Sequence, residues 1–298
     1  MKRYGWLVVA AIALPACSTH KVTGPAFDEN ADVTILFVGN SLTYFHDVPS
    51  LVRQLAARQD MSVSTATIAY PDFSLEDHWN NGIADEIRRL SPDFVVMQQG
   101  PSSLVENRAH LVHWSQQLAA VIREAGGEPA LYMVWPDNTR RFAFPAVEAS
   151  YAEAARAVNG RLLPVGTTWL RAWDQDSELP LYASDGLHAS YLGALAAAQT
   201  IYAGLLDVDA ATLAALDDNV TADRLNVLRV AVAASIQQWQ ATPSDLHSRF
   251  RLGLSGNWFS TLFRRIGRGG QCDGRAGAIG VVGVRLGAQD TLQCWAFT

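Results

Sequence analysis

The chain has 298 residues, of which 49% are hydrophobic and 17% are charged, and its formal net charge at pH 7 is −6. This composition is typical of a globular protein with one large domain or two small ones, and it excludes a fibrous or fully disordered chain. An acidic chain is also a poor candidate for binding nucleic acid or anionic lipid surfaces.

The first residues predict export. Two basic residues precede an apolar segment, Trp6–Leu14, which is too short to span a bilayer as a mature helix. The segment ends in "LPAC", which resembles a bacterial lipoprotein signal with Cys17 as the lipidated first residue. We therefore expect a signal peptide over residues 1–16, a linker over 17–30, and a lipid anchor as the only membrane attachment. Ser18 favours the Gram-negative outer membrane, facing the periplasm. A plain secretory signal, in which Cys17 has no role, is the alternative.

The three cysteines do not predict a metal site, because no short Cys or His spacing accompanies them. If Cys17 carries lipid, Cys272 and Cys294 are free to pair in an oxidising compartment.

Between residues 31 and 242, short β-branched runs alternate with helix-length segments. The predicted strands are 33–38, 62–69, 93–98, 130–135 and 161–166. The predicted helices are 48–59, 74–90, 109–126, 145–160, 189–206 and 221–240. Such alternation indicates βαβ units, and so an α/β fold whose parallel sheet carries helices on both faces.

The character of the chain changes after Pro243. Residues 244–298 hold 7 Arg, 3 acidic residues and 10 of the 22 glycines, and their periodicity fades. We interpret residues 243–298 as a flexible C-terminal extension and predict no function for it.

A polar cluster, "GNSL", follows the first predicted strand. Open parallel sheets bind ligands at the carboxyl ends of their strands, and Gly39 permits a sharp turn there. Ser41 is therefore a candidate nucleophile, provided that a base takes the proton of its hydroxyl. The alternative is that Ser41 caps the helix that follows.

His188 is the best-placed base among the seven histidines. It lies in "YASDGLHAS", beyond the fifth predicted strand, with Asp185 three residues before it on a glycine-containing loop. This spacing lets the carboxylate bond the inner ring nitrogen while the outer nitrogen faces a serine. The alternative is that both are ordinary loop residues.

Together, "FVGNSLT" and "SDGLHAS" resemble the SGNH/GDSL hydrolase family, in the branch that carries GNSL, and the resemblance covers about residues 31–240. It implies a flavodoxin-like three-layer α/β/α sandwich and a catalytic triad of Ser41, Asp185 and His188. The implied activity is that of a serine esterase without metal or organic cofactor, acting on short acyl groups such as acetyl on carbohydrate.

The resemblance also implies an oxyanion hole, to which the Ser41 N–H contributes. Asp72 stands where the family places a glycine whose N–H points into the hole, and Asp tolerates unusual backbone angles. Ser102 stands in place of a family asparagine. An amide from Gln98 or Gln99 is a further candidate, and strand alternation lets one of the two face the site, with Gln98 favoured.

Asn40, His78 and Trp135 are the candidates for contact with substrate. His78 and Trp135 are included because an aromatic wall suits a sugar. The alternative for His78 is that it caps its helix or faces water. Two other functions stay open: a catalytically weak or inactive carbohydrate-binding lipoprotein, and a structural envelope lipoprotein. The latter would expose an apolar patch away from Ser41.

Overall fold

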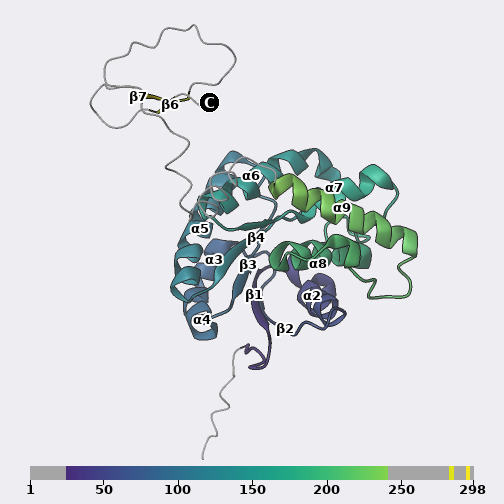
Figure 1. The fold of residues 1–298 in the computed structure, drawn as a ribbon, viewed down its shortest axis with the longest axis horizontal. Helices are drawn as coiled ribbons and strands as arrows, with labels where there is room; N and C mark the ends of the chain where they lie inside the picture. Colours follow the sequence, from purple (N-terminus) through teal and green to yellow (C-terminus); the bar gives the residue numbers. More distant parts are fainter. Residues whose placement is uncertain (1–24, 241–281, 285–292, 296–298) are drawn as a thin grey trace, which may run out of the picture. The chain divides into compact units, whose positions relative to one another are not determined.

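Figure 1 shows the fold in a computed structural model of the chain, which describes residues 25–240, 282–284 and 293–295. The predicted signal peptide over residues 1–16, Cys17 and Cys272 lie outside the described residues. Contacts divide the chain into two units, Met1–Gln237 and Gln238–Thr298.

The first unit is built on a five-stranded sheet in which every strand pairs in parallel with its neighbours. The strand order is β2-β1-β3-β4-β5. The strands are β1 (Val33–Gly39), β2 (Val63–Ala69), β3 (Phe94–Met97), β4 (Glu128–Tyr132) and β5 (Arg161–Leu163). This is the flavodoxin-like order, so the predicted α/β fold is confirmed.

Helices cover both faces of this sheet (Figure 1). One face carries α2 (Val48–Ala57) and α8 (Tyr191–Leu206). The other carries α3 (Leu75–Asn80), α4 (Ile83–Leu90), α5 (Val105–Glu124) and α6 (Phe144–Ala157). The remaining helices are α7 (Val165–Gln175), which packs on α6 and α8, and α9 (Ala222–Gln240). Short turns of helix complete the unit: α1 (Ser41–Tyr44), η1 (Phe45–Asp47), η2 (Asn138–Ala143) and η3 (Ala210–Thr212).

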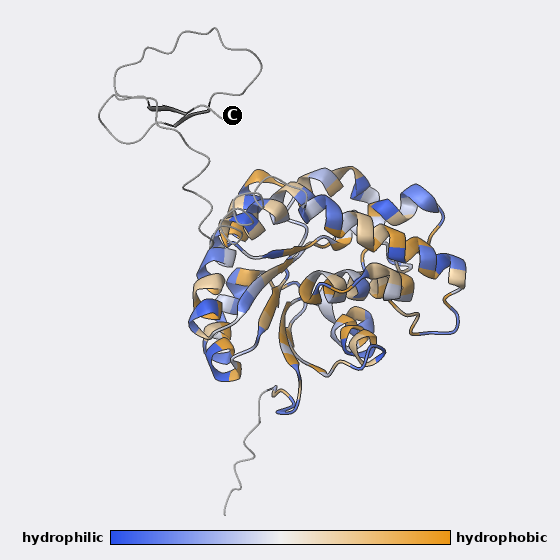
Figure 2. Cartoon of the chain, viewed as in Figure 1, coloured by the Kyte–Doolittle hydropathy of each residue, from blue (hydrophilic) through white to orange (hydrophobic). Residues whose placement is uncertain are grey.

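The core lies between the sheet and these helices. Figure 2 shows mainly hydrophobic central strands and outer helices that alternate between hydrophobic and hydrophilic residues. Within β1, Ile35–Val38 are completely buried. A continuous apolar run is what a strand covered on both faces requires.

Several boundaries differ from the sequence expectations: the strand predicted over 130–135 covers Glu128–Tyr132, and the helix predicted over 109–126 begins at Val105. Two further differences change the elements themselves. The helix predicted over 74–90 is two helices, because Gly82 adopts φ +85° between them, a backbone conformation that suits glycine. The strand predicted over 161–166 ends at Leu163, and Pro164 becomes the N-cap of the unexpected helix α7.

The second unit contains a short antiparallel pair, β6 (Val282–Val284) and β7 (Gln293–Trp295), which the sequence did not predict. Within the described part of the chain, no helix is both long and apolar enough to cross a membrane.

Candidate active site

Ser41 lies where β1 turns into α1, at the carboxyl edge of the sheet. Asn40 is extended, at φ −130°, and its Oδ1 accepts a hydrogen bond from the Leu42 N–H at 3.1 Å. Asn40 is therefore the helix N-cap and Ser41 the first helical residue. The alternative interpretation of Ser41 as an N-cap is wrong, because its neighbour performs that role.

Gln98, just beyond the end of β3, fixes this turn. Its Oε1 accepts from the Asn40 N–H at 2.8 Å and the Thr43 hydroxyl at 2.7 Å. Its Nε2 donates to Asn40 Oδ1 at 2.9 Å and the Gln99 carbonyl at 2.7 Å. Both amide hydrogens are thus used inside the protein, and Gln98 is fully buried. The prediction that Gln98 supplies an oxyanion donor is therefore wrong in this structure: Gln98 supports the loop that carries Ser41.

Gly39 is explained by the same contact. A Cβ at this position would lie 2.4 Å from both Gln98 Oε1 and Thr43 Oγ1. Close approach of these polar atoms, rather than the sharp turn expected from the sequence, requires a glycine here.

His78 lies in α3, is 1% exposed, and places its Nε2 2.8 Å from the Gly39 carbonyl oxygen. Since a carbonyl only accepts, Nε2 carries the hydrogen and Nδ1 is unprotonated. Burial lowers the pKa of His78, which keeps the ring neutral. The prediction that His78 contacts substrate is wrong, and so is the alternative that it faces water, because the ring is enclosed beneath the Ser41 turn.

Asp185 and His188 form a tight pair on the loop between α7 and α8. Asp185 Oδ2 lies 2.6 Å from His188 Nδ1, and Oδ1 accepts from the N–H groups of Leu187 at 2.9 Å and His188 at 3.0 Å. The bond to the His188 ring, followed by these backbone bonds, lowers the pKa of Asp185 to about 2. The carboxylate therefore stays ionised at neutral pH and holds the hydrogen of the imidazole on Nδ1, which leaves Nε2 as the basic atom.

Two backbone carbonyl groups of this loop accept hydrogen bonds from the segment that follows β4. The Asn138 N–H donates to the Gly186 carbonyl at 2.7 Å, and Trp135 Nε1 donates to the Leu187 carbonyl at 2.9 Å. Trp135 is completely buried, and its ring stacks on Trp169 at 3.9 Å. The prediction that Trp135 contacts substrate is therefore wrong: it packs in the core and anchors the loop of His188.

Phe45 connects the two halves of the site. Its N–H donates to the Ser41 carbonyl, and its ring stacks on that of His188, with centroids 4.4 Å apart and planes at 22°. The ring that stacks on His188 thus belongs to the residue whose backbone N–H closes the first helical turn after Ser41. His188 Nε2 is buried and accepts no hydrogen bond from any described residue. Sequence reasoning missed Phe45, although an aromatic residue one turn after the serine was the available signal.

The other predicted site residues lie nearby on neighbouring strand ends. Asp72, after β2, adopts φ +59°, and Ser102, after β3, adopts φ +55°. The Ser102 hydroxyl accepts from Gln99 Nε2 at 2.8 Å and donates to the Gly100 carbonyl at 3.0 Å. The side chain of Ser102 is thus already engaged, while an oxyanion role for the N–H groups of Ser41 and Asp72 stays a prediction.

Asn40 is also buried, and its side chain bonds Leu42, Gln98 and the Phe73 carbonyl. Its contact with substrate stays a prediction.

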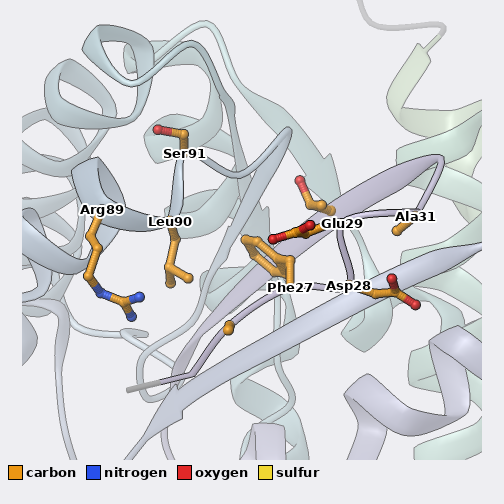
Figure 3. Close-up of a pocket in the computed structure, with 9 residues that line it drawn as sticks. Phe27, Asp28, Glu29, Ala31, Arg89, Leu90 and Ser91 are labelled. Carbon is orange, nitrogen blue, oxygen red and sulfur yellow. The ribbon is translucent and has the colours of Figure 1, made fainter. Parts of the chain in front are cut away.

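A separate pocket of about 330 Å³ lies at the opposite, amino edge of the sheet (Figure 3). Thr34 at the start of β1 and Ser91 before β3 belong to its lining, with Phe27 and Arg89. None of the predicted site residues lines it. Within residues 25–240, no cluster of His, Cys, Asp and Glu side chains could hold a metal ion.

Comparison with known proteins gives similarity at the level of the fold. No model of a protein family matches the sequence, and no curated protein matches it either. Among solved structures, a DUF4886 family protein from Bacteroides uniformis has a TM-score of 0.61 at 15% identity, over 69% of this chain and 95% of that one. A protein from Slackia heliotrinireducens described as a "putative SGNH hydrolase" has a TM-score of 0.51 at 24% identity, over 59% of this chain and all of that one. The chain therefore shares its fold with an SGNH-hydrolase-like protein.

Proposed function

We propose that this protein is a serine esterase in which Ser41 is the nucleophile, His188 the general base and Asp185 the residue that orients the base. The observation that carries the proposal is the His188 ring: Asp185 bonds its Nδ1, Phe45 stacks it beside the Ser41 turn, and its buried Nε2 has no partner among the described residues. A buried basic nitrogen without a partner is costly unless it has a proton to receive.

The proposed reaction is acyl transfer in two steps. As Ser41 Oγ bonds to the ester carbonyl carbon, His188 Nε2 takes the hydroxyl proton, and the carbonyl oxygen becomes an oxyanion. The N–H groups of Ser41 and Asp72 are the proposed donors to that oxyanion. The bond to the alcohol then breaks, and His188 returns the proton to the leaving oxygen. Water attacks the acyl-enzyme with His188 again as base, which releases the acid and restores Ser41.

The acetylated carbohydrate named above stays a prediction. Its structural basis is weaker than the sequence suggested, because both ring systems expected to form a sugar-binding wall, His78 and Trp135, are buried. The structural lipoprotein is also less favoured, since it calls for an apolar patch away from Ser41, whereas most exposed apolar side chains of the described residues lie on the loops of the Ser41 edge.

Hydrolysis of an aryl acetate tests the triad. The exported chain is compared with Ser41→Ala and His188→Ala, and with two matched controls: Ser50→Ala in α2 and His113→Ala, an exposed residue of α5. We expect the controls to keep the parent rate and the two triad variants to lose on the order of 10⁴-fold in kcat. Equal rates in parent and triad variants would refute the proposal. Sugar binding that survives Ser41→Ala, without hydrolysis by the parent, would favour the binding lipoprotein.

We also propose an envelope location through lipid on Cys17. Fatty-acid labelling of the expressed protein tests this: Cys17→Ser should abolish the label and move the chain from the membrane fraction to the soluble one. Label that persists in Cys17→Ser would contradict the proposal.

A further inference from the structure

The exposed apolar side chains are distributed unevenly. Among the described residues, seven large apolar side chains are exposed, and six of them lie at the carboxyl edge of the sheet. We call these six the apolar rim: Tyr44, Tyr70, Leu104, Val105, Phe142 and Leu187. The seventh, Val230, belongs to α9. Scattered exposed apolar residues are normal in any protein, but a concentration on one edge is typical of an interaction site.

The apolar rim crosses the sheet in the order of the strands. Tyr70 follows β2, Tyr44 ends the turn after β1, Leu104 and Val105 follow β3, and Phe142 follows β4. Adjacent strands lie about 4.8 Å apart, so loops after four successive strands extend over roughly 14 Å. This line passes the strand end that carries Ser41.

Backbone and side-chain bonds show that these loops are neighbours. The Tyr70 N–H donates to the Gly39 carbonyl at 3.2 Å, next to the Ser41 turn. Arg140 Nη2, two residues before Phe142, donates to Ser103 Oγ at 3.1 Å, next to Leu104. Leu187 immediately precedes His188.

Val105 and Phe142 are the most exposed members, at 77% and 82%. Phe142 lies in an ordered turn, since Ala143 beside it is buried and Arg141 stacks on Trp173 at 3.9 Å. The Phe142 side chain is therefore exposed although the residues on either side of it are fixed by contacts with the rest of the protein.

The start of α5 also carries apolar residues where polar ones would stabilise the helix. Leu104 occupies the N-cap position and makes no side-chain capping bond. Ser, Thr, Asp or Asn would stabilise that position by about 1 kcal/mol. The exposed parts of Leu104 and Val105 add no buried apolar surface to the fold, which favours contact with a ligand.

We infer that the apolar rim binds a hydrocarbon chain of the ester substrate, so that the enzyme prefers esters with a medium or long chain, on the acyl or the alcohol side, to esters with short chains on both sides. This inference rests on the proposed function of Ser41, and it replaces the expected acetyl ester of a carbohydrate with an ester that carries a medium or long hydrocarbon chain. The chain lies along the rim from the Ser41 turn toward Val105 and Phe142, and Leu187 covers it from the side of His188.

The test measures kcat/KM for a series of aryl esters from acetate to dodecanoate, kept below their aggregation limits. Full burial of a methylene group corresponds to about a fourfold gain in binding, so a chain half covered on an open rim should gain about twofold per methylene. A second series, acetates of alcohols from ethanol to dodecanol, tells whether the chain belongs to the acyl or the alcohol side. A gain along either series supports the inference.

Variants locate the effect. In Val105→Ser/Phe142→Ser, we expect the ratio of kcat/KM for octanoate to that for acetate, or the matching ratio in the alcohol series, to fall about tenfold. Val230→Ser, a matched exposed residue outside the apolar rim, should leave both ratios unchanged. Both substituted residues are exposed, so urea unfolding should be like that of the parent.

The outcomes separate the inference from the function on which it rests. Hydrolysis that depends on Ser41 but not on chain length, or a chain-length gain that survives the double substitution, overturns the inference alone. No hydrolysis that depends on Ser41 overturns both. Rates that respond to phosphatidylcholine vesicles but not to the chain length of dissolved esters would assign the apolar rim to a lipid surface, and would also overturn the inference.

Discussion

Gln98→Met is the substitution that separates structural support of the Ser41 turn from a direct part in catalysis. Gln98 is completely buried and makes four hydrogen bonds, two through Oε1 and two through Nε2. Methionine has a similar shape but offers none of these bonds. At a net value of about 1 kcal/mol for each bond, the free energy of unfolding should fall by about 4 kcal/mol. That is a large part of the roughly 5–15 kcal/mol that holds a domain folded.

The chain supplies a matched control for the same substitution. Gln199 in α8 is equally buried, but its Nε2 donates one bond, to the Ala214 carbonyl at 3.2 Å, and its Oε1 has no partner among the described residues. Gln199→Met loses this one bond but also removes the buried Oε1 that has no partner, so it should cost at most about 1 kcal/mol. The apolar gain from the methionine side chain is the same in both variants, so it cancels in the comparison.

Urea unfolding followed by circular dichroism measures both variants, and aryl acetate hydrolysis is measured beside it. We expect Gln98→Met to be less stable than Gln199→Met by at least about 3 kcal/mol, and to lose activity because Asn40, next to Ser41, loses its support. Equal stability of the two variants would refute the supporting role. A loss of kcat in Gln98→Met at parental stability would restore the oxyanion role that the hydrogen bonds exclude.

Three further changes test other parts of the molecule. Burial lowers the pKa of His78, so the unfolded chain binds a proton at this residue more readily than the folded protein, and the contribution of neutral His78 to the free energy of unfolding is present above the unfolded pKa of 6.5 and is lost as the pH falls below it. His78→Phe should therefore flatten the fall in the urea midpoint between pH 7 and 5. An unchanged dependence of the midpoint on pH would contradict this. Phe45→Leu should lower kcat for aryl acetate about tenfold, because it removes the aromatic ring that stacks on His188 and orients it, whereas Phe45→Tyr keeps such a ring and should keep the parental kcat. Equal kcat in the parent and both variants would contradict a positioning role. Gly193→Ala should abolish folding, because the new methyl group would lie 2.1 Å from a backbone carbonyl oxygen. Gly204→Ala in the same helix would place its methyl group 3.0 Å from a leucine methyl, and its free energy of unfolding in urea should equal that of the parent within about 1 kcal/mol.

The fold was predictable because its signals are local and periodic. A buried strand such as 33–38 is a continuous apolar run, and the helices that follow carry apolar residues on one side. The errors came from single residues with special backbone geometry. Gly82 divides a segment that reads as one helix, and Pro164 begins a helix where the surrounding leucines and valine indicated a strand.

The candidate site was less predictable, because roles there depend on burial. Ser41, Asp185 and His188 were found from short motifs, and their catalytic role stays a prediction. His78 and Trp135 were mistaken for ligand contacts, since a sequence does not show whether a polar aromatic residue at a strand end faces solvent or the core. Phe45 was missed because its partner, His188, lies 143 residues away in the chain.

The loop of Asp185 and His188 is held by main-chain carbonyl groups, those of Gly186 and Leu187. Such anchors do not depend on which side chain stands at position 187, which is itself exposed. Mutation at this position is therefore free to change the surface that a ligand meets while the geometry of the Asp185–His188 pair persists. The side chain at position 187 can therefore vary while the backbone of the loop is kept, so we expect relatives of this protein to differ there and consider it a suitable position for directed evolution of new specificity.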